Sequence, residues 1–312
     1  MRVLVIGGTG FIGRHLVARL VKAGHAVNVP TRRYQNGRDL LVFPALNLLD
    51  ADVHDDRALE GLISEADAVI NLAGILHSRP GKPYGPDFAR VHVELPRRIA
   101  ATCRKLGVRR LLHVSALGAS ANGASGYQRS KAAGEAAIWE EFQSYPDGAC
   151  TIFRPSVVFG PDDNFMNRFA RLARWLPIIP LACSKSRLQP VYVGDVADAI
   201  SQALVNSLTH GRVYTLAGFA DYTLAELVEL AAKWSGHPRR ILPLPMFLGR
   251  MQAFVFECMP GEPIMSRDNL DSLKVDNISD ESMAPELRIV AKSLESIAPA
   301  YLAPKRKSLG RA

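Results

Sequence analysis

The stretch "VIGGTGFIGRHL" at residues 5–16 decides the fold of this chain of 312 residues. It places glycines at positions 7, 8, 10 and 13 between a run of valine and isoleucine and a segment with helical spacing of apolar residues. Glycine permits a tight turn with unusual dihedral angles and lets backbone approach a ligand without an intervening Cβ. Because the turn opens into a helix N-terminus with free N–H groups, it predicts a site for the pyrophosphate of a dinucleotide. A structural turn without a ligand is the alternative.

Short apolar runs alternate with helical segments through the first two-thirds of the chain. Strands are predicted at 2–6, 26–30, 46–53, 66–74, 109–116 and 150–160, with helices that include 11–23, 87–106 and 127–142. Parallel neighbours require right-handed crossovers, so this order predicts an α/β fold with a Rossmann-type doubly wound parallel sheet. We expect a dinucleotide-binding domain over 1–160, to which 190–206 returns. A smaller mixed substrate or partner lobe over 161–312 follows and ends in a basic tail.

Composition narrows the class of protein. The formal net charge is +8 and the sequence pI about 9.5, which favours phosphorylated ligands or anionic surfaces. The basic residues are spread thinly without a zinc-finger or RNA-binding pattern, so no nucleic-acid partner is expected. The four cysteines show no paired or metal-like spacing, which predicts a reduced compartment. No stretch of the sequence reaches the length of a membrane span, so we expect a cytoplasmic protein; a peripheral position at the inner face of the membrane is a second option.

The end of the second strand indicates which cofactor is bound. A site that prefers NAD(H) places an acid there for the ribose hydroxyls, whereas "PTRRY" at 30–34 supplies Arg32 and Arg33. Two guanidiniums can grip a 2′-phosphate in bidentate fashion, so the sequence predicts NADP(H) over NAD(H). Solvated surface charge is the alternative. Asp52 lies at the end of the predicted third strand and could accept a hydrogen bond from the adenine amino group, with Asp50 and Asp55 as alternatives.

"YQRSK" at 127–131 places a tyrosine and a lysine on one face of a predicted helix. A nearby ammonium and the positive charge of an oxidised nicotinamide both favour the phenolate. Tyr127 is therefore a candidate general acid or base for a carbinol or carbonyl oxygen, and Lys131 could also bind the nicotinamide ribose. A surface tyrosine stacked on a lysine stem is the alternative.

"GGTGFIG", the Asp52 region, "NLAG" at 71–74, "YQRSK", "RPSVVFGP" and "VYVGDVADAI" occur in one order over residues 1–235. That order resembles the extended short-chain dehydrogenase/reductases, the NAD-dependent epimerase/dehydratase group. The resemblance implies a Ser–Tyr–Lys constellation and cofactor contacts near Pro155 and Val157. For the serine of this constellation, the end of the fifth strand offers a single candidate, Ser115. Ser120 and Ser125, which lie further along the chain, are alternatives for the same role. No metal site is expected, since His77 and His92 form no ligand-like pair. The expected catalytic residues are Tyr127, Lys131 and Ser115; the expected cofactor-binding residues are Gly7, Gly10, Phe11, Ile12, Gly13, Arg32, Arg33, Asp52, Val53, Leu72, Ala73, Gly74, Lys131, Pro155 and Val157.

The arginines after the second strand, "YQRSKAAGE", and "PGEPIMSRDNLDSLKVDN" at 260–277 resemble the branch that contains the Rossmann-fold accessory subunit of respiratory complex I. That resemblance implies tightly held NADPH. Two functions are therefore expected. One is hydride transfer at a hydroxyl or carbonyl of a small hydrophobic substrate. The other is a non-catalytic NADPH-holding accessory or assembly subunit of complex I or of a quinone or lipid pathway, docked through the amphipathic 244–258 stretch. A sugar-nucleotide epimerase is less favoured.

Overall fold

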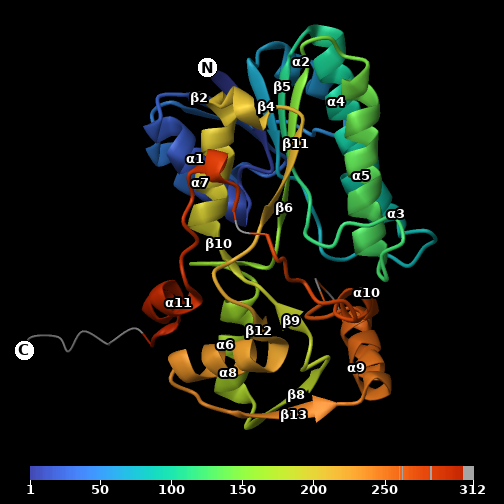
Figure 1. Ribbon diagram of the computed structural model, residues 1–312, viewed down its shortest axis with the longest axis vertical. Coiled ribbons are helices and arrows are strands. Elements are labelled where there is room, and N and C mark those ends of the chain that lie inside the picture. Colours follow the sequence, from blue (N-terminus) through green and yellow to red (C-terminus); the bar gives the residue numbers. More distant parts are fainter. Residues whose placement is uncertain (260, 262, 282, 305–312) are drawn as a thin grey trace, which may run out of the picture.

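The computed structural model describes residues 1–259, 261, 263–281 and 283–304. At its centre lies a seven-stranded sheet in the order β11-β6-β5-β4-β1-β2-β3, in which all neighbouring strands are parallel (Figure 1). This doubly wound order confirms the predicted Rossmann-type fold. The strands are β1 (Arg2–Ile6), β2 (Ala26–Thr31), β3 (Leu46–Asp50), β4 (Ala68–Asn71), β5 (Arg110–Val114), β6 (Ala149–Pro155) and β11 (Arg212–Leu216).

Strand β1 shows how the sheet is buried on both faces. Val3 and Val5 contribute to one hydrophobic core, while Leu4 and Ile6 contribute to a second core on the opposite face. Successive side chains of a strand point to opposite faces, so a continuous apolar run requires helices on both sides. Helices α1 (Phe11–Lys22) and α7 (Val193–Val205) cover one face, and α2 (Asp56–Ser64), α4 (Leu95–Leu106) and α5 (Gly126–Gln143) cover the other (Figure 1).

The helix expected at 87–106 contains an irregular turn. It begins as α3 (Pro86–Phe88), continues as the π-helical η2 (Ala89–Glu94) and becomes regular in α4. Pro96 has no N–H to donate to the His92 carbonyl, which explains why the regular ladder is interrupted before it. A Cβ on Gly134 of α5 would lie 1.9 Å from the His92 carbonyl oxygen, so glycine is required at this crossing. The π-turn places His92 against α5.

The second lobe has its own hydrophobic core, to which Phe159, Phe169 and Leu227 contribute. Its short strands pair as β7 with β10, β8 with β13, and β9 with β12. Its elements are β7 (Val158–Phe159), α6 (Met166–Trp175), β8 (Ile178–Ala182), β9 (Arg187–Leu188), β10 (Val191–Tyr192), β12 (Tyr222–Thr223), α8 (Leu224–Trp234), β13 (Arg240–Leu244), α9 (Met246–Cys258), α10 (Arg267–Ser272) and α11 (Leu294–Leu302). Short helical turns are η1 (Tyr34–Val42), η3 (Ser207–Thr209) and η4 (Pro285–Leu287).

The segment that returns to the sheet extends beyond the expected 190–206. Helix α7 packs in the core of the sheet, and β11, ending at Leu216, pairs with β6 along its whole length. The reason is that β6 would otherwise be an open edge, which β11 covers. Of the expected basic tail, residues 305–312 lie outside the described residues. In the part of the chain that the structure describes, each helix is too short or too polar to span a bilayer.

Candidate functional site

The glycine turn between β1 and α1 is closely packed. Gly7 has φ +82°, and a Cβ on it would lie 3.0 Å from the carbonyl carbon of Leu72. A Cβ on Gly13 would lie 2.4 Å from the Gly7 carbonyl oxygen, so glycine is needed for α1 to begin against the turn. Gly10 is the N-cap of α1 and offers no side chain to the free N–H groups. These donors are therefore available to an anion.

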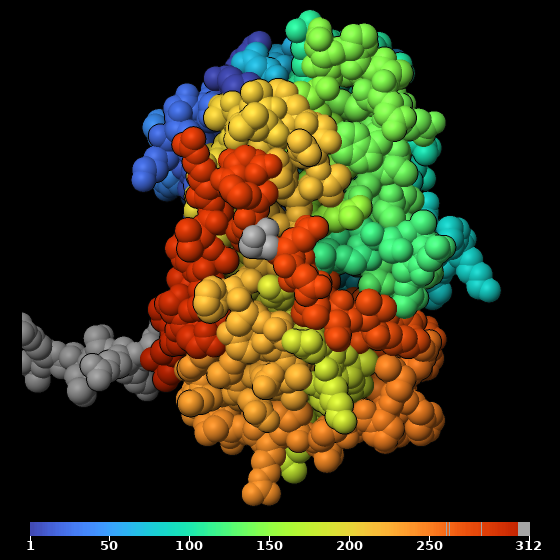
Figure 2. Space-filling model, in the orientation of Figure 1, coloured from blue at the N-terminus to red at the C-terminus, as the bar shows by residue number. Residues whose placement is uncertain are grey.

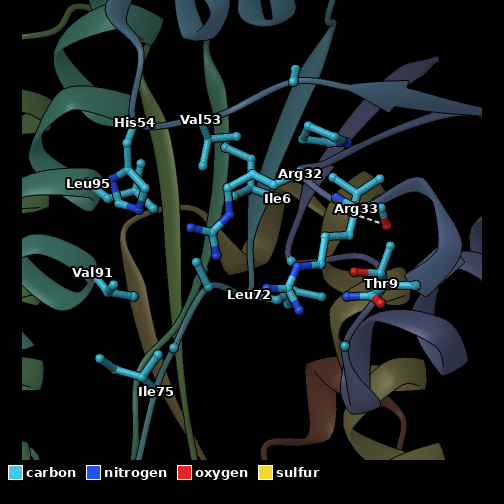
Figure 3. A pocket seen from close by; sticks show the side chains of 18 residues that line it. Ile6, Thr9, Arg32, Arg33, Val53, His54, Leu72, Ile75, Val91 and Leu95 are labelled. Carbon is cyan, nitrogen blue, oxygen red and sulfur yellow. Dashed lines mark hydrogen bonds between the residues drawn. The ribbon is translucent and has the colours of Figure 1, made fainter. Parts of the chain in front are cut away.

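A cavity of about 700 Å³ opens at the carboxyl ends of β1, β2 and β4, where ligands bind in doubly wound sheets (Figure 3). This volume suits a small-molecule cofactor. The expected residues Gly7, Gly10, Arg32, Arg33, Val53, Leu72, Ala73 and Gly74 all line it. The lining also includes residues without a specific prediction: Ile6, Thr9, Pro30, Thr31, Asn36, Ala51, His54, Ile75, Val91 and Leu95.

Other expected cofactor residues lie outside this lining. The Asp52 carboxylate accepts a hydrogen bond from the His54 backbone N–H at 3.0 Å. Phe11 packs edge-on against His15, and Ile12 packs against the core under the sheet. Gly13 lies beneath the turn, Pro155 ends β6, and Val157 packs against the core of the second lobe. The cavity is therefore lined by the predicted glycine backbone and by both arginines, whereas these other expected residues do not line it.

Arg32 and Arg33 follow β2 and are both exposed. The Thr31 hydroxyl donates to the Arg33 carbonyl oxygen at 3.1 Å, which fixes the turn where β2 ends. Figure 3 shows both guanidiniums in the cavity. Within the described ranges, neither guanidinium has a carboxylate oxygen within 4 Å, whereas Arg14 nearby is paired with Asp39. The two charges remain available to an anionic ligand.

Tyr127 and Lys131 occupy the first turns of α5. Lys131 Nζ lies 5.9 Å from the centroid of the Tyr127 ring and donates to the Val114 carbonyl oxygen at 3.2 Å. A Cβ on Gly74 would lie 3.3 Å from Lys131 Nζ, so the ammonium borders the cavity wall. The Lys131 side chain is buried, and Tyr127 is half-buried.

Burial sets the protonation states of this pair. It raises the pKa of Tyr127 to about 12. It also lowers the pKa of Lys131 to about 8, although the negative charge of Glu135 acts in the opposite direction on that lysine. At pH 7 the tyrosine is therefore a neutral phenol and the lysine an ammonium ion. The arrangement can donate a proton to an oxygen placed beside Tyr127.

The three candidate serines differ in what their hydroxyl groups contact. Ser125 is the N-cap of α5, and its Oγ accepts from the Gln128 N–H at 3.1 Å. Ser120 is exposed, and its Oγ accepts from the Asn122 N–H. Ser115 is 3 % exposed at the end of β5, and its buried Oγ has no hydrogen-bond partner among the described residues. Of the three, Ser115 therefore carries the hydroxyl that no described residue engages.

His92 belongs to the site, although the sequence offers no signal for it beyond Pro96 four residues on. Its ring stacks on Phe88 and meets the Tyr127 ring edge-on, with centroids 5.1 Å and 5.5 Å apart. Nε2 accepts from the Ile75 N–H at 3.0 Å, so the proton is assigned to Nδ1, which lies 2.9 Å from Ser130 Oγ. Burial, with a smaller contribution from the Lys131 charge, lowers the pKa of His92 to about 2. The neutral imidazole supports one side of the Tyr127 ring.

Comparison with known proteins assigns the chain to a family. The model of the NAD dependent epimerase/dehydratase family matches residues 3–217, and the chain belongs to this family. The chain is 32% identical over 285 residues to the "NADH dehydrogenase [ubiquinone] 1 alpha subcomplex subunit 9, mitochondrial" of Rattus norvegicus, covering 88% of this chain and 72% of that one. It is also 32% identical over 251 residues to the "Ceramide reductase" of Caulobacter vibrioides, covering 78% and 73%. The solved UDP-glucose 4-epimerase of Thermus thermophilus in complex with NAD has the same fold, with a TM-score of 0.67, 24% identity, and 88% and 99% of the two chains covered.

Proposed function

We propose that the protein is an NADP(H)-dependent oxidoreductase that transfers hydride at a hydroxyl or carbonyl of a small hydrophobic substrate. One observation carries this proposal: the Lys131 ammonium lies 5.9 Å from the centroid of the Tyr127 ring and also lies beside Gly74, which lines the cavity. Family membership supports a nicotinamide cofactor. Arg32 and Arg33, which have no carboxylate partner among the described residues, support the 2′-phosphorylated form.

Each residue has a defined role in this proposal. The backbone of Gly7 and Gly10 receives the pyrophosphate at the N-terminus of α1, and Lys131 binds the nicotinamide ribose. The bound cofactor supplies or accepts the hydride. Ser115 Oγ binds the substrate oxygen, and Tyr127 gives that oxygen its proton.

The raised pKa makes Tyr127 a proton donor at neutral pH. With the pKa of Tyr127 raised to about 12 by burial, the phenol is protonated at neutral pH and serves as a general acid toward a carbonyl oxygen. Oxidation requires the phenolate, which the charge of an oxidised nicotinamide would favour. The likeness to the reductase of Caulobacter vibrioides supports a lipid-like carbonyl substrate.

The test is single-turnover oxidation of bound NADPH by a panel of aliphatic ketones, with Tyr127→Phe compared with the wild type. The variant keeps the ring that packs edge-on against Phe88 and His92 and loses only the hydroxyl, so we expect at least a 100-fold slower turnover. Tyr145→Phe is the matched control, because Tyr145 lies beyond the opposite end of α5. Equal rates for Tyr127→Phe and the wild type would refute the catalytic assignment.

A second candidate function is a subunit that holds NADPH and docks on a respiratory assembly at the inner face of the membrane. The likeness to mitochondrial subunits supports it, and so does the outer face of α9. On that face Phe247, Met251, Phe254 and Val255 are each more than half exposed. An apolar face of this kind is typical of an interaction site.

Purification separates the two functions. A docked subunit is expected to retain NADPH that no carbonyl oxidises and to co-migrate with a respiratory complex from detergent-solubilised membranes. The double variant Phe247→Ser, Phe254→Ser is expected to abolish co-migration and keep the nucleotide. Val205→Ser changes an exposed apolar residue of α7 and serves as the control. Rapid NADPH oxidation by a carbonyl, with no co-migration, would exclude this second function.

A further inference from the structure

Helix α10 of the second lobe reaches the first turn of α5, which carries Tyr127. The Asp268 carboxylate accepts one hydrogen bond from the Gly126 N–H at 2.6 Å and another from the Tyr127 N–H at 3.0 Å. These residues are separated by more than 140 positions in the chain. In Figure 2 the red-orange segment that includes α10 lies across the junction between the green part of the sheet domain and the lower lobe.

The first turn of α5 needs this carboxylate to satisfy its backbone. A helix begins with N–H groups that have no partner within the helix. Ser125 Oγ accepts from the Gln128 N–H, so the N–H groups of Gly126 and Tyr127 are left, and Asp268 takes both. A carboxylate is suited to this place because its charge opposes the positive end of the helix dipole and its hydrogen bonds are charge-assisted.

The segment around Asp268 is itself fastened to the sheet domain. The Ser272 hydroxyl donates to Ser125 Oγ at 2.8 Å, and the Asn277 side-chain amide donates to the Leu117 carbonyl oxygen at 2.9 Å. Ser156 Oγ donates to Asn277 Oδ1 at 2.6 Å. The same segment therefore holds the start of α5 and the loop that follows Ser115.

We propose that Asp268 is a positioning residue that sets the place of Tyr127 in the site, so that the second lobe controls the alignment of the proton donor. This proposal rests on the proposed function of Tyr127. Asp268 contacts the backbone N–H of Tyr127, which fixes the Cα from which the ring extends to pack edge-on against Phe88 and His92. A displacement of about 1 Å at a reacting group can cost about 100-fold in rate.

The experiment compares Asp268→Asn and Asp268→Ala with the wild type, using Asp271→Asn as the matched control. Asp271 lies on the same helix and pairs with Arg250 and Lys274, away from α5. We expect Asp268→Asn, which keeps one acceptor oxygen, to lower kcat about 10-fold and Asp268→Ala about 100-fold, with the KM for NADPH changed less than twofold. Asp271→Asn is expected to leave kcat unchanged.

Hydrogen exchange of the amides of Gly126 and Tyr127 gives a readout that needs no turnover. Both Asp268 variants are expected to exchange these amides at least tenfold faster, while Asp271→Asn leaves them protected. If no carbonyl compound in the panel oxidises NADPH on the wild-type protein but exchange accelerates in the Asp268 variants as expected, the proposed function fails. The role of Asp268 as an anchor of α5 then stands. Unchanged exchange in either Asp268 variant, or an unchanged kcat in folded Asp268→Ala, would overturn the proposal.

Discussion

The arginine pair at the end of β2 gives the sharpest prediction about the cofactor. We expect Arg32→Ala and Arg33→Ala each to weaken NADPH binding and to leave NADH binding nearly unchanged. Both guanidiniums line the cavity, and within the described ranges neither is held by a carboxylate, so neither must break an ion pair to reach a 2′-phosphate.

The magnitude follows from the exposure of the two side chains. A hydrogen bond to a charged group contributes about 1.5–3 kcal/mol, and solvent screening places exposed groups at the lower end. About 1.5 kcal/mol per arginine corresponds to roughly a tenfold rise in the Kd for NADPH. The double variant is then expected to lose about 100-fold if the two effects add.

The assay is fluorescence titration of the apo protein with NADPH and with NADH at low and at high salt. Salt should weaken NADPH binding in the wild type more than in the double variant, because the variant has lost the screened charges. Arg38→Ala, an exposed arginine of η1 outside the cavity lining, is the control and should bind both nucleotides as the wild type does. Equal losses for NADPH and NADH in the double variant would refute the assignment of these arginines to the 2′-phosphate.

Four further predictions concern stability and the serine. Gly13→Ala places a Cβ 2.4 Å from a backbone carbonyl oxygen and should destabilise the fold by about 2–3 kcal/mol. A Cβ on Gly61, in α2, would have no neighbouring atom within 4 Å, so Gly61→Ala should raise the free energy of unfolding by up to about 1 kcal/mol. Urea denaturation measures both glycine variants, and a destabilising Gly61→Ala would contradict the reasoning. Burial lowers the pKa values of His92 and His113 to about 2 and about 3 from the ordinary 6.5, so the unfolded chain binds more protons below pH 6.5. The free energy of unfolding should therefore fall by about 3–4 kcal/mol between pH 6.5 and pH 5, and a flat profile would show that the two rings are not buried in neutral form. Ser115→Ala removes a hydroxyl that has no hydrogen-bond partner among the described residues, so the free energy of unfolding should change by less than about 1 kcal/mol while kcat falls at least 100-fold. A normal kcat would show that another group binds the substrate oxygen.

Local patterns in the sequence were sufficient to predict the sheet, the glycine turn and the arginine pair. The continuous apolar run of β1 requires cover on both faces, and the spacing from Gly7 to Gly13 requires a turn that only glycine can make. Arg32 and Arg33 were predictable because they come directly after the apolar run that forms β2. The family was predictable for the same reason, since its motifs occupy successive strand ends.

Other parts of the site depend on residues that only folding brings together. The sequence left Ser115, Ser120 and Ser125 as alternatives, and their hydroxyl contacts distinguish them only in three dimensions. His92 had no visible partner in the sequence, yet the π-turn carries it to the Tyr127 ring.

The sequence by itself therefore determined the fold class, the glycine turn and the proximity of Tyr127 to Lys131, because strand periodicity, helical spacing and backbone conformation are properties of neighbouring residues. The tertiary structure decided which serine hydroxyl is free, how His92 supports the ring and how Asp268 caps α5. Those contacts join residues that are tens to more than a hundred positions apart, and no local pattern encodes which distant groups will satisfy each other's hydrogen bonds once water is excluded.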